Sequence, residues 1–251
     1  MLLEAPASTE ILRVGLDPRS PPSAFVPGAN YSYDDTRQPP LIGEEALRRL
    51  EGFEIDVMNA LARRLGMSPR VVPTSWYALE RGLLEGRYDV ILSSWTPSDR
   101  TPKEIAASIP YYDWGLIVAV RAEDARIRTL ANLAGRKIGH IPDPSVERAL
   151  RELNTGLGVG SVLVRDSGSL LFDDLKAGTI DALIFDSPSV RWRVSRDPFF
   201  QVVGEPLNRL GYHVGLRRED AALLARFNVA IQAFRDSDEL HEIQRKWGSG
   251  P

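Results

Sequence analysis

Two similar stretches, one in each half of the chain, constrain its fold more than any other feature. They are Gly86–Ser94, which reads GRYDVILSS, and Gly178–Asp186, which reads GTIDALIFD. Each contains Gly-x-x-Asp, then a short apolar run, then a polar side chain where the run ends. Such a run is typical of a strand buried on both faces of a parallel sheet. Because each stretch holds the same place in the strand and helix order of its half, the echo predicts two lobes of similar topology.

Strand and helix patterns alternate through the rest of the chain. The expected strands are Ile11–Leu16, Arg70–Pro73, Tyr88–Leu92, Leu116–Val120, Lys137–Ile141, Val162–Val164 and Ile180–Phe185. The expected helices are Glu44–Leu50, Glu54–Leu65, Trp76–Glu85, Leu130–Leu133, Ser145–Leu153, Leu170–Lys176, Glu219–Phe234 and Glu239–Trp247. The region Pro27–Ile42, rich in Pro, Tyr and Asp, is expected to be an exposed loop. The alternation predicts an α/β fold with mainly parallel sheets flanked by helices and right-handed crossovers.

The composition excludes several classes of protein. A chain of 251 residues with 43% hydrophobic and 26% charged residues is long enough for two modest lobes with real cores. The net charge of −3 gives no field that would gather nucleic acid. The sequence has no cysteine, and its three histidines lack ligand spacing, so neither a metal site nor a cofactor is expected. No apolar run approaches the roughly 20 residues that a membrane span requires.

Polar side chains gather just beyond the expected strands, where open α/β sheets bind their ligands. The candidate ligand-binding residues are Asp17, Trp76, Ser93, Ser94, Trp95, Thr96, Arg100, Ser145 and Asp186. The set contains an arginine and a helix N-terminus, which suit a carboxylate, and aspartates, which suit an ammonium group. It therefore predicts a receptor for an α-amino acid zwitterion, whose two charges need paired hydrogen bonds when they leave water.

Several candidates also have a purely structural interpretation. Asp186 precedes Ser-Pro-Ser and is suited to capping a helix, and Ser145 is suited to a first helical turn. Asp17 precedes a proline and is suited to forming a turn. Arg100 is compatible with a solvated loop position, and Trp76 with the core. On the residues alone these alternatives stay open.

Five stretches that span nearly the whole chain carry a family resemblance. They are VGLDPRSPP; GFEIDVMNALARRLG, the most specific; WYALERGLLEGRYDVILSSWTPSDR with IPYYDWG; LAGRKIGHIPDPSVE; and LKAGTIDALIFD with the tail FNVAIQAFRDSDELHEIQRKWG. The chain resembles the family-3 solute-binding proteins of ABC transporters, of the polar amino-acid-binding type with a two-lobe "Venus flytrap" fold of the periplasmic-binding-protein kind. The resemblance implies a binding protein, not an enzyme. It would capture a small amino acid in the interlobe cleft and deliver it to a membrane permease.

The resemblance also implies how the lobes are organised. Lobe 1 is expected to be discontinuous, with residues 1–118 and 217–251, and lobe 2 to contain residues 119–216. Hinge strands are expected near 116–121 and 210–216. The protein is expected to be a monomer in the periplasm or outside the cell. Its N-terminus, MLLEAPASTE, is too short and too acidic for a signal peptide, so a leader is expected to be missing from this sequence.

The resemblance implies roles in the first half for four matched residues. Asp17 would face the ligand side chain, and Trp76 would stand where the family places an aromatic wall. Ser94 and Thr96 would offer backbone and hydroxyl contacts to the charged groups of the ligand. The sequence departs from the family at Ser20, where an aromatic residue is usual.

The resemblance also assigns the two charges of the ligand. Arg100 would clamp the α-carboxylate, helped by Ser145, and Asp186 would hold the α-ammonium group. The loop spacing departs from the family pattern, and a shift would put Thr101 in the place of the arginine. Asp143 stands where the family prefers glycine, which adds an acid near the expected carboxylate.

Two sets of residues point to different ligand side chains. Asp17 and Asp143 favour a cation or an amide. Against them, Trp76, Trp95 and Trp114 are suited to a pocket for an apolar or aromatic group. We expect a polar or basic amino acid.

Two other functions are compatible with the same fold. Some relatives resemble cyclohexadienyl dehydratases, which need a general acid beside the leaving hydroxyl. The glutamate of that group would stand at Ser189, and serine cannot protonate a leaving group at neutral pH. The third reading is the ligand-sensing domain of a receptor, which a transmembrane helix after Pro251 in the gene would favour.

Overall fold

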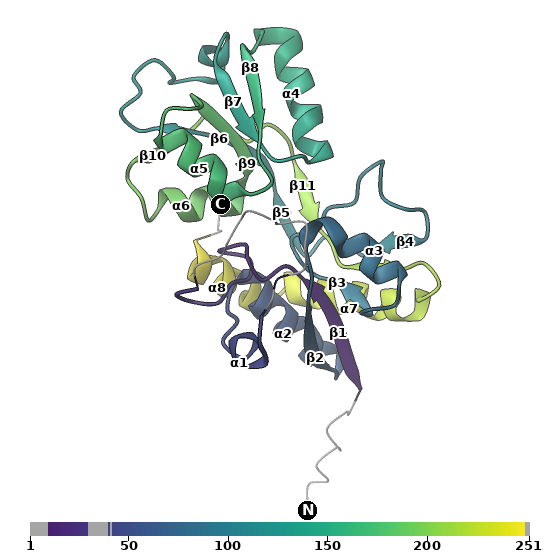
Figure 1. Ribbon diagram of the computed structural model, residues 1–251. Coiled ribbons are helices and arrows are strands. Elements are labelled where there is room, and N and C mark those ends of the chain that lie inside the picture. The colour runs from purple at the N-terminus through teal and green to yellow at the C-terminus, as the bar shows by residue number, and fades with distance from the viewer. Residues whose placement is uncertain (1–9, 30–39, 41, 249–251) are drawn as a thin grey trace, which may run out of the picture. The chain divides into compact units, whose positions relative to one another are not determined.

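The computed structural model describes residues 10–29, 40 and 42–248, and the described chain divides into two compact units (Figure 1). Unit 1 contains residues 10–29, 40, 42–111 and 212–243. Unit 2 contains residues 112–211 and 244–248. Most of the loop expected at Pro27–Ile42 lies outside the described residues. The chain thus passes into unit 2 at Tyr112 and returns to unit 1 at Tyr212.

Unit 1 is built on a five-stranded sheet with the order β2-β1-β3-β12-β4. Its strands are β1 (Ile11–Leu16), β2 (Ser68–Pro73), β3 (Val90–Ile91), β4 (Ile105–Ala107) and β12 (Gly215–Arg217). Strands β2, β1 and β3 are parallel, and β12 runs antiparallel to both β3 and β4. Its helices are α1 (Glu44–Leu47), α2 (Phe53–Leu65), η1 (Trp76–Ala78), α3 (Leu79–Leu84) and α7 (Ala221–Arg235), and α8 (Asp238–Trp247) follows α7.

Unit 2 is built on a second five-stranded sheet with the order β10-β6-β9-β7-β8. Its strands are β6 (Leu116–Arg121), β7 (Lys137–His140), β8 (Ser161–Val164), β9 (Ala182–Asp186) and β10 (Phe200–Val203). Strands β8, β7 and β9 are parallel, and β6 runs antiparallel to β9 and β10. Its helices are η2 (Leu130–Leu133), α4 (Pro144–Leu157), α5 (Gly168–Lys176) and α6 (Ser187–Val194).

The central strands of the unit 2 sheet, β6 and β9, are buried on both faces, as their apolar runs predict. Alternate residues of β6 point to opposite sides: Leu116 and Val118 join the cluster under α4, and Ile117 and Ala119 join the cluster under α5 and α6. Figure 1 shows α4 on one side of these strands and α5 and α6 on the other. A strand covered on both faces needs apolar residues at every position, which explains the continuous run LIVAV.

The two units repeat one topology, which confirms the prediction from the echoed stretches. In each, the second, first and third parallel strands lie side by side, and an antiparallel pair of strands, β12 with β4 or β6 with β10, completes the sheet. β3 and β9, which come from the echoed stretches, both take the third place. The α/β fold class is confirmed. The strands β4, β10 and β5 (Tyr112–Trp114) were not expected from the sequence. β11 (Leu210–Tyr212), which pairs with β5 in a two-stranded sheet, and β12 lie where a hinge strand was expected near 210–216.

The aspartate of Gly-x-x-Asp has the same role in both units. Asp89 donates its amide to the carbonyl oxygen of Arg13 at 2.9 Å and accepts the amide of Arg13 on its carboxylate at 2.9 Å. Asp181 donates its amide to the carbonyl oxygen of Lys137 at 2.8 Å and accepts the amide of Lys137 at 3.0 Å. The motif therefore fixes the start of the third strand against the first strand, and this sets the register of each sheet.

A glycine in the first parallel strand of each unit, β1 or β7, makes room for the side chain of the residue that precedes the aspartate. A Cβ atom on Gly15 would lie 2.4 Å from the ring of Tyr88, and one on Gly139 would lie 2.5 Å from Ile180. Both large side chains are fully buried. The two similar stretches therefore share one packing arrangement, in which a large buried side chain before the aspartate packs on a glycine of the neighbouring strand.

Candidate functional site

The carboxylate of Asp17, just beyond β1, is buried and already bonded. Its side chain accepts the amide and Nε of Arg19 at 3.1 and 2.9 Å on Oδ1, and Nη2 of Arg19 at 2.8 Å on Oδ2. The amide of Trp76 donates to Oδ2 at 2.9 Å. Asp17 and Arg19 are only 5% and 8% exposed. The turn predicted for Asp17 is thus formed, and its carboxylate holds a guanidinium from this same chain.

Ser93 and Ser94, just beyond β3, are fixed by different partners. Ser93 is buried and accepts the amide of Asp17 on its Oγ at 3.0 Å. Ser94 has φ 51 and is the one non-glycine residue of the described chain with a positive φ. Its amide and hydroxyl donate to Oε1 of Glu54 at 2.9 and 3.0 Å, and its hydroxyl contacts that of Ser23. These bonds stabilise a left-handed conformation that serine rarely adopts.

Glu54, in the first turn of α2, is a buried acid that sequence reasoning missed. Its side chain is 0% exposed and accepts the Tyr111 hydroxyl at 2.7 Å on Oε1 and 2.9 Å on Oε2. Burial raises the pKa of Glu54 to about 7, and the hydrogen bonds from Tyr111 and Ser94 offset only part of that rise. The signal was present, because Glu54 lies between apolar neighbours in the most family-specific stretch.

Trp95 and Thr96 continue the same loop. Trp95 is 3% exposed, packs in the core cluster under α3 and donates its Nε1 to Oε1 of Glu80 at 3.1 Å. Thr96 is half-buried. Trp95 therefore anchors the loop to unit 1, and the half-buried Thr96 follows it.

Arg100 and Thr101 lie at the far end of the loop and differ in exposure. Arg100 is exposed, and its amide donates to Oγ of Ser98 at 3.1 Å. Thr101 accepts the amide of Ser98 at 3.0 Å and donates its hydroxyl to Glu80 at 3.0 Å. The sequence left open whether Arg100 or Thr101 takes the place of the family arginine. In the structure Thr101 is bonded to Glu80 of α3, and Arg100 is exposed on the surface.

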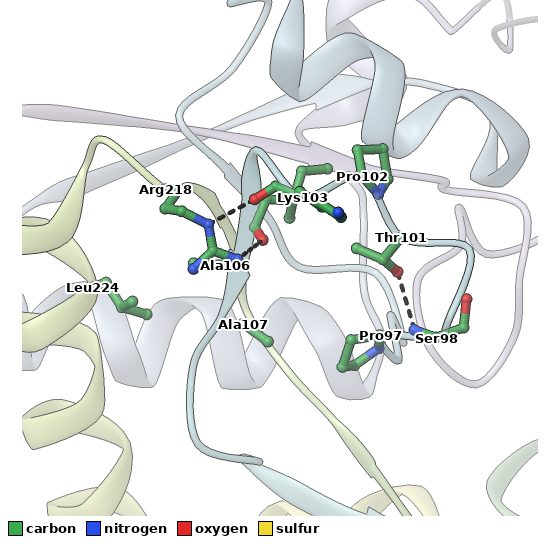
Figure 2. Close-up of a pocket in the computed structure, with 10 residues that line it drawn as sticks. Pro97, Ser98, Thr101, Pro102, Lys103, Ala106, Ala107, Arg218 and Leu224 are labelled. Atoms are coloured by element: carbon green, nitrogen blue, oxygen red, sulfur yellow. Dashed lines mark hydrogen bonds between the residues drawn. The ribbon is translucent and has the colours of Figure 1, made fainter.

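A hollow of about 460 Å³ lies in unit 1 beyond this loop (Figure 2). It is lined by Pro97, Ser98, Thr101, Pro102, Lys103, Ile105, Ala106, Ala107, Arg218 and Leu224. Figure 2 shows Arg218 reaching the loop backbone, where its Nε donates to the Lys103 carbonyl oxygen at 2.6 Å and its Nη2 to that of Ile105 at 3.1 Å. None of the nine predicted site residues lines this hollow, so it is a separate feature.

In unit 2, the two candidates lie at helix N-termini beyond the parallel strands β7 and β9. Asp186 caps α6 and accepts the amide of Ser189 at 2.8 Å. Asp143 caps α4 and accepts the amide of Ser145 at 2.7 Å and the hydroxyl of Ser145. Asp186 thus caps a helix and Ser145 lies in a first helical turn, as their structural interpretations expect, and the N-terminus of α4 already holds a carboxylate.

The structure thus groups the predicted residues unit by unit. Asp17, Trp76 and Ser93 form one hydrogen-bonded cluster in unit 1, and Ser94 joins that cluster to Glu54 through the chain. Arg100 lies on the exposed part of the same loop. Among the described residues, no three His, Cys, Asp or Glu side chains form a group that could hold a metal ion. No helix within the described ranges is long and apolar enough to cross a bilayer.

Comparison with known proteins gives consistent matches over almost the whole chain. Residues 12–250 match the family model of the bacterial extracellular solute-binding proteins, family 3. The L-cystine-binding protein TcyJ of Escherichia coli is 29% identical over 201 residues, which are 79% of this chain and 74% of that protein. The lysine/arginine/ornithine-binding periplasmic protein of Escherichia coli is 28% identical over 247 residues, which are 94% of each chain.

Solved structures give the same result. An ancestral arginine-binding protein bound to arginine matches with a TM-score of 0.75 and 26% identity, covering 94% of this chain and 97% of that one. The holo form of ArgBP from T. maritima matches with a TM-score of 0.69 and 28% identity, covering 95% and 96%. The similarity extends over both units.

Proposed function

Because the chain belongs to family 3 of the bacterial extracellular solute-binding proteins, we propose that it captures an amino acid outside the cytoplasm and presents it to the permease of an ABC transporter. The observation that carries this proposal is the match over residues 12–250, together with relatives named for binding cystine, lysine and arginine. Amino-acid binding is common to these relatives. The proposal has three further parts. They are the permease as partner, the location outside the cytoplasm and a monomeric state.

The strand ends of the two units supply complementary chemistry for a zwitterion. In unit 1, Ser94 directs both of its donors to Glu54 and so fixes the loop, on which Thr96 offers backbone and hydroxyl donors. Arg100 offers an exposed guanidinium for the α-carboxylate. In unit 2, the carboxylate of Asp186 is half-buried at the end of β9 and serves the α-ammonium group. Charge-assisted hydrogen bonds at both ends supply the roughly 8 kcal/mol of micromolar binding. The hinge strands expected near 116–121 and 210–216 remain part of the proposal, and the chain passes between the units at 111–112 and 211–212.

The ion pair of Asp17 and Arg19 bears on the choice of ligand. Arg19 presents Nε and Nη2 to the two carboxylate oxygens, at 2.9 and 2.8 Å. An arginine side chain would use the same two-bond geometry, and any basic ligand that paired with Asp17 would have to displace Arg19 from a buried pair. We therefore propose a ligand with a polar, uncharged side chain, and we expect basic amino acids to bind more weakly.

Binding rather than catalysis is the activity we propose. Ser189, which aligns with the general acid of the dehydratases, donates its amide to the cap formed by Asp186. Its hydroxyl cannot protonate a leaving group at neutral pH. Incubation with prephenate or arogenate should yield no aromatic product by ultraviolet absorption, and formation of product would overturn this part.

A thermal-shift screen of the common amino acids, with cystine and ornithine added, tests the main proposal. A ligand present at roughly 100 times its dissociation constant adds about 2.7 kcal/mol to the stability of the folded state. We expect a polar amino acid to raise the melting temperature, with calorimetry giving the affinity. If no amino acid raises it, the assignment fails.

A further inference from the structure

Glu54 stands out in the described part of unit 1, because it is completely buried there and no cation pairs with it. The groups that contact its carboxylate are the amide and hydroxyl of Ser94 and the hydroxyl of Tyr111. Within the described residues, no lysine or arginine pairs with it. Buried glutamates are rare unless they are paired, and breaking such a site is costly. A carboxylate kept here needs a reason other than stability.

The contacts of Glu54 join three parts of unit 1. Glu54 itself lies in the first turn of α2, where its amide donates to the carbonyl oxygen of Ser23 at 2.8 Å. Ser94 belongs to the loop after β3 that carries the predicted ligand contacts. Tyr111 is the last residue before the chain enters unit 2, and its amide donates to the carbonyl oxygen of Tyr212, where the chain returns. One carboxylate thus bonds both the loop and the segment at the passage between the units.

Ser94 depends on these bonds for its conformation. Its φ of 51 places a serine in the left-handed region, which is unfavourable for a residue with a side chain unless other bonds compensate. Both of its donors meet the same oxygen of Glu54. An ionised carboxylate accepts such bonds about twice as strongly as a neutral one. The charge on Glu54 therefore favours the conformation of Ser94 that the structure shows.

We propose that Glu54 is a positioning residue for the ligand-binding loop: its ionised carboxylate holds Ser94 in place, and protonation loosens Ser94 and weakens ligand binding. The part that concerns the ligand rests on the proposed function. The part that concerns Ser94 stands on the contacts within unit 1 alone.

The groups that face Glu54 leave it as the titrating member of the cluster. Tyr111 is the titratable side chain in contact with it, and Tyr212 lies behind Tyr111 with ring centroids 6.2 Å apart. Burial raises the pKa of the Tyr111 hydroxyl well above its usual value of about 10, so Tyr111 stays neutral. Burial also raises the pKa of Glu54 to about 7, which places its titration at ordinary pH.

The first experiment follows Ser94 without a ligand, by nuclear magnetic resonance on the full chain between about pH 5 and pH 9. In the wild type the Ser94 amide should titrate with a midpoint near the pKa of Glu54, about 7. In Glu54→Gln, which keeps the size and a carbonyl acceptor but carries no charge, the Ser94 amide should not titrate. A Ser94 amide that is insensitive to pH in the wild type would overturn the proposal.

The second experiment measures the dissociation constant of the amino acid found in the screen, at about pH 5.5 and pH 8.5. The wild type should bind about fivefold more weakly at the lower pH, the loss expected for one hydrogen bond. Glu54→Gln should bind with the weaker affinity at both pH values. Equal pH dependence in the two proteins would contradict the role of Glu54.

A matched control comes from the other glutamate that contacts the same loop. Glu80 accepts Nε1 of Trp95 and the hydroxyl of Thr101, and it is only partly buried. Glu80→Gln should keep the pH dependence of the wild type, whereas loss of that dependence would mean that any change near the loop has this effect. If no amino acid binds at all, the proposed function fails, but the titration of Ser94 still tests Glu54.

Discussion

The ends of β3 and β9 hold opposite chemistry on one framework. Both strands take the third place in their sheets, and both begin at an aspartate bonded to the first strand. Beyond β3, Ser94 directs its amide and hydroxyl donors to an acid that comes from α2. At the end of β9, Asp186 supplies the acid itself and caps the following helix. The comparison teaches that a repeated fold can end the same strand in two ways, with a loop fixed by an acid from another helix in unit 1 and with an acid that caps the next helix in unit 2.

The largest effect is expected from changing Asp186. Asp186→Asn should weaken amino-acid binding about a thousandfold, because it leaves a desolvated ammonium group without its charge partner. Asparagine is also a good helix cap, so stability should change little. Calorimetry and thermal unfolding give the two numbers. Retained affinity in Asp186→Asn would mean that β9 does not supply the acceptor, and the comparison would fail.

A pH effect on stability of similar size is expected from Glu54. The pKa of Glu54 is raised from 4.5 to about 7 on folding, so between these values the folded state binds more protons than the unfolded state. The free energy of unfolding should therefore fall as pH rises through this window, by about 3 kcal/mol in total.

Chemical denaturation at several pH values measures this effect, and subtraction of the Glu54→Gln profile removes the contributions of other groups. Stability would then fall with rising pH while ligand binding strengthens. If the difference in the free energy of unfolding between the wild type and Glu54→Gln stays constant or rises with pH, the pKa of Glu54 is not raised by folding.

A smaller effect is expected at Asp17. Arg19→Met should free its carboxylate for a basic ligand and raise the affinity for arginine about tenfold, the value of one charge-assisted hydrogen bond. The double variant Asp17→Asn/Arg19→Met is the control, because it removes the acceptor as well. Calorimetry with arginine compares the three proteins. Unchanged affinity in Arg19→Met would place Asp17 away from the ligand side chain.

The smallest effect is expected at the cap of α4. Asp143→Ala removes the acceptor for the amides of Ser145 and Val146 and should lower the free energy of unfolding by about 1 kcal/mol. Asp143→Asn should cost only a few tenths of that. Equal losses in the two variants would mean that the charge of Asp143, rather than its hydrogen bonds, stabilises the helix end.

The sequence was most informative where one element carries a long, regular pattern. Residues 54–65 were expected to form a helix, and α2 spans Phe53–Leu65. The first strand was placed at Ile11–Leu16, where the structure has it. The repeated Gly-x-x-Asp stretches predicted equivalent strands because both the motif and its place in the order recur.

Some short strands, and the hydrogen-bond partners of the polar residues, could not be predicted from the sequence. β4 has three residues and is defined by its neighbour β12, which no local pattern reveals. Asp17 and Ser94 were correctly identified as polar strand-end residues. Their partners Arg19 and Glu54 were not, because a carboxylate in the sequence carries no sign of whether it meets a ligand or a neighbouring side chain.

The insertion of β12 between β3 and β4 has a consequence for the newly made protein. Unit 2 is nearly continuous, and the bond from Lys137 to Asp181 closes a segment of 44 residues, against 76 for the bond from Arg13 to Asp89. Unit 1 cannot complete its sheet until the ribosome has added Gly215–Arg217. The middle of the polypeptide can therefore reach its native form first, while the N-terminal portion waits, incomplete, for a strand that is translated almost last.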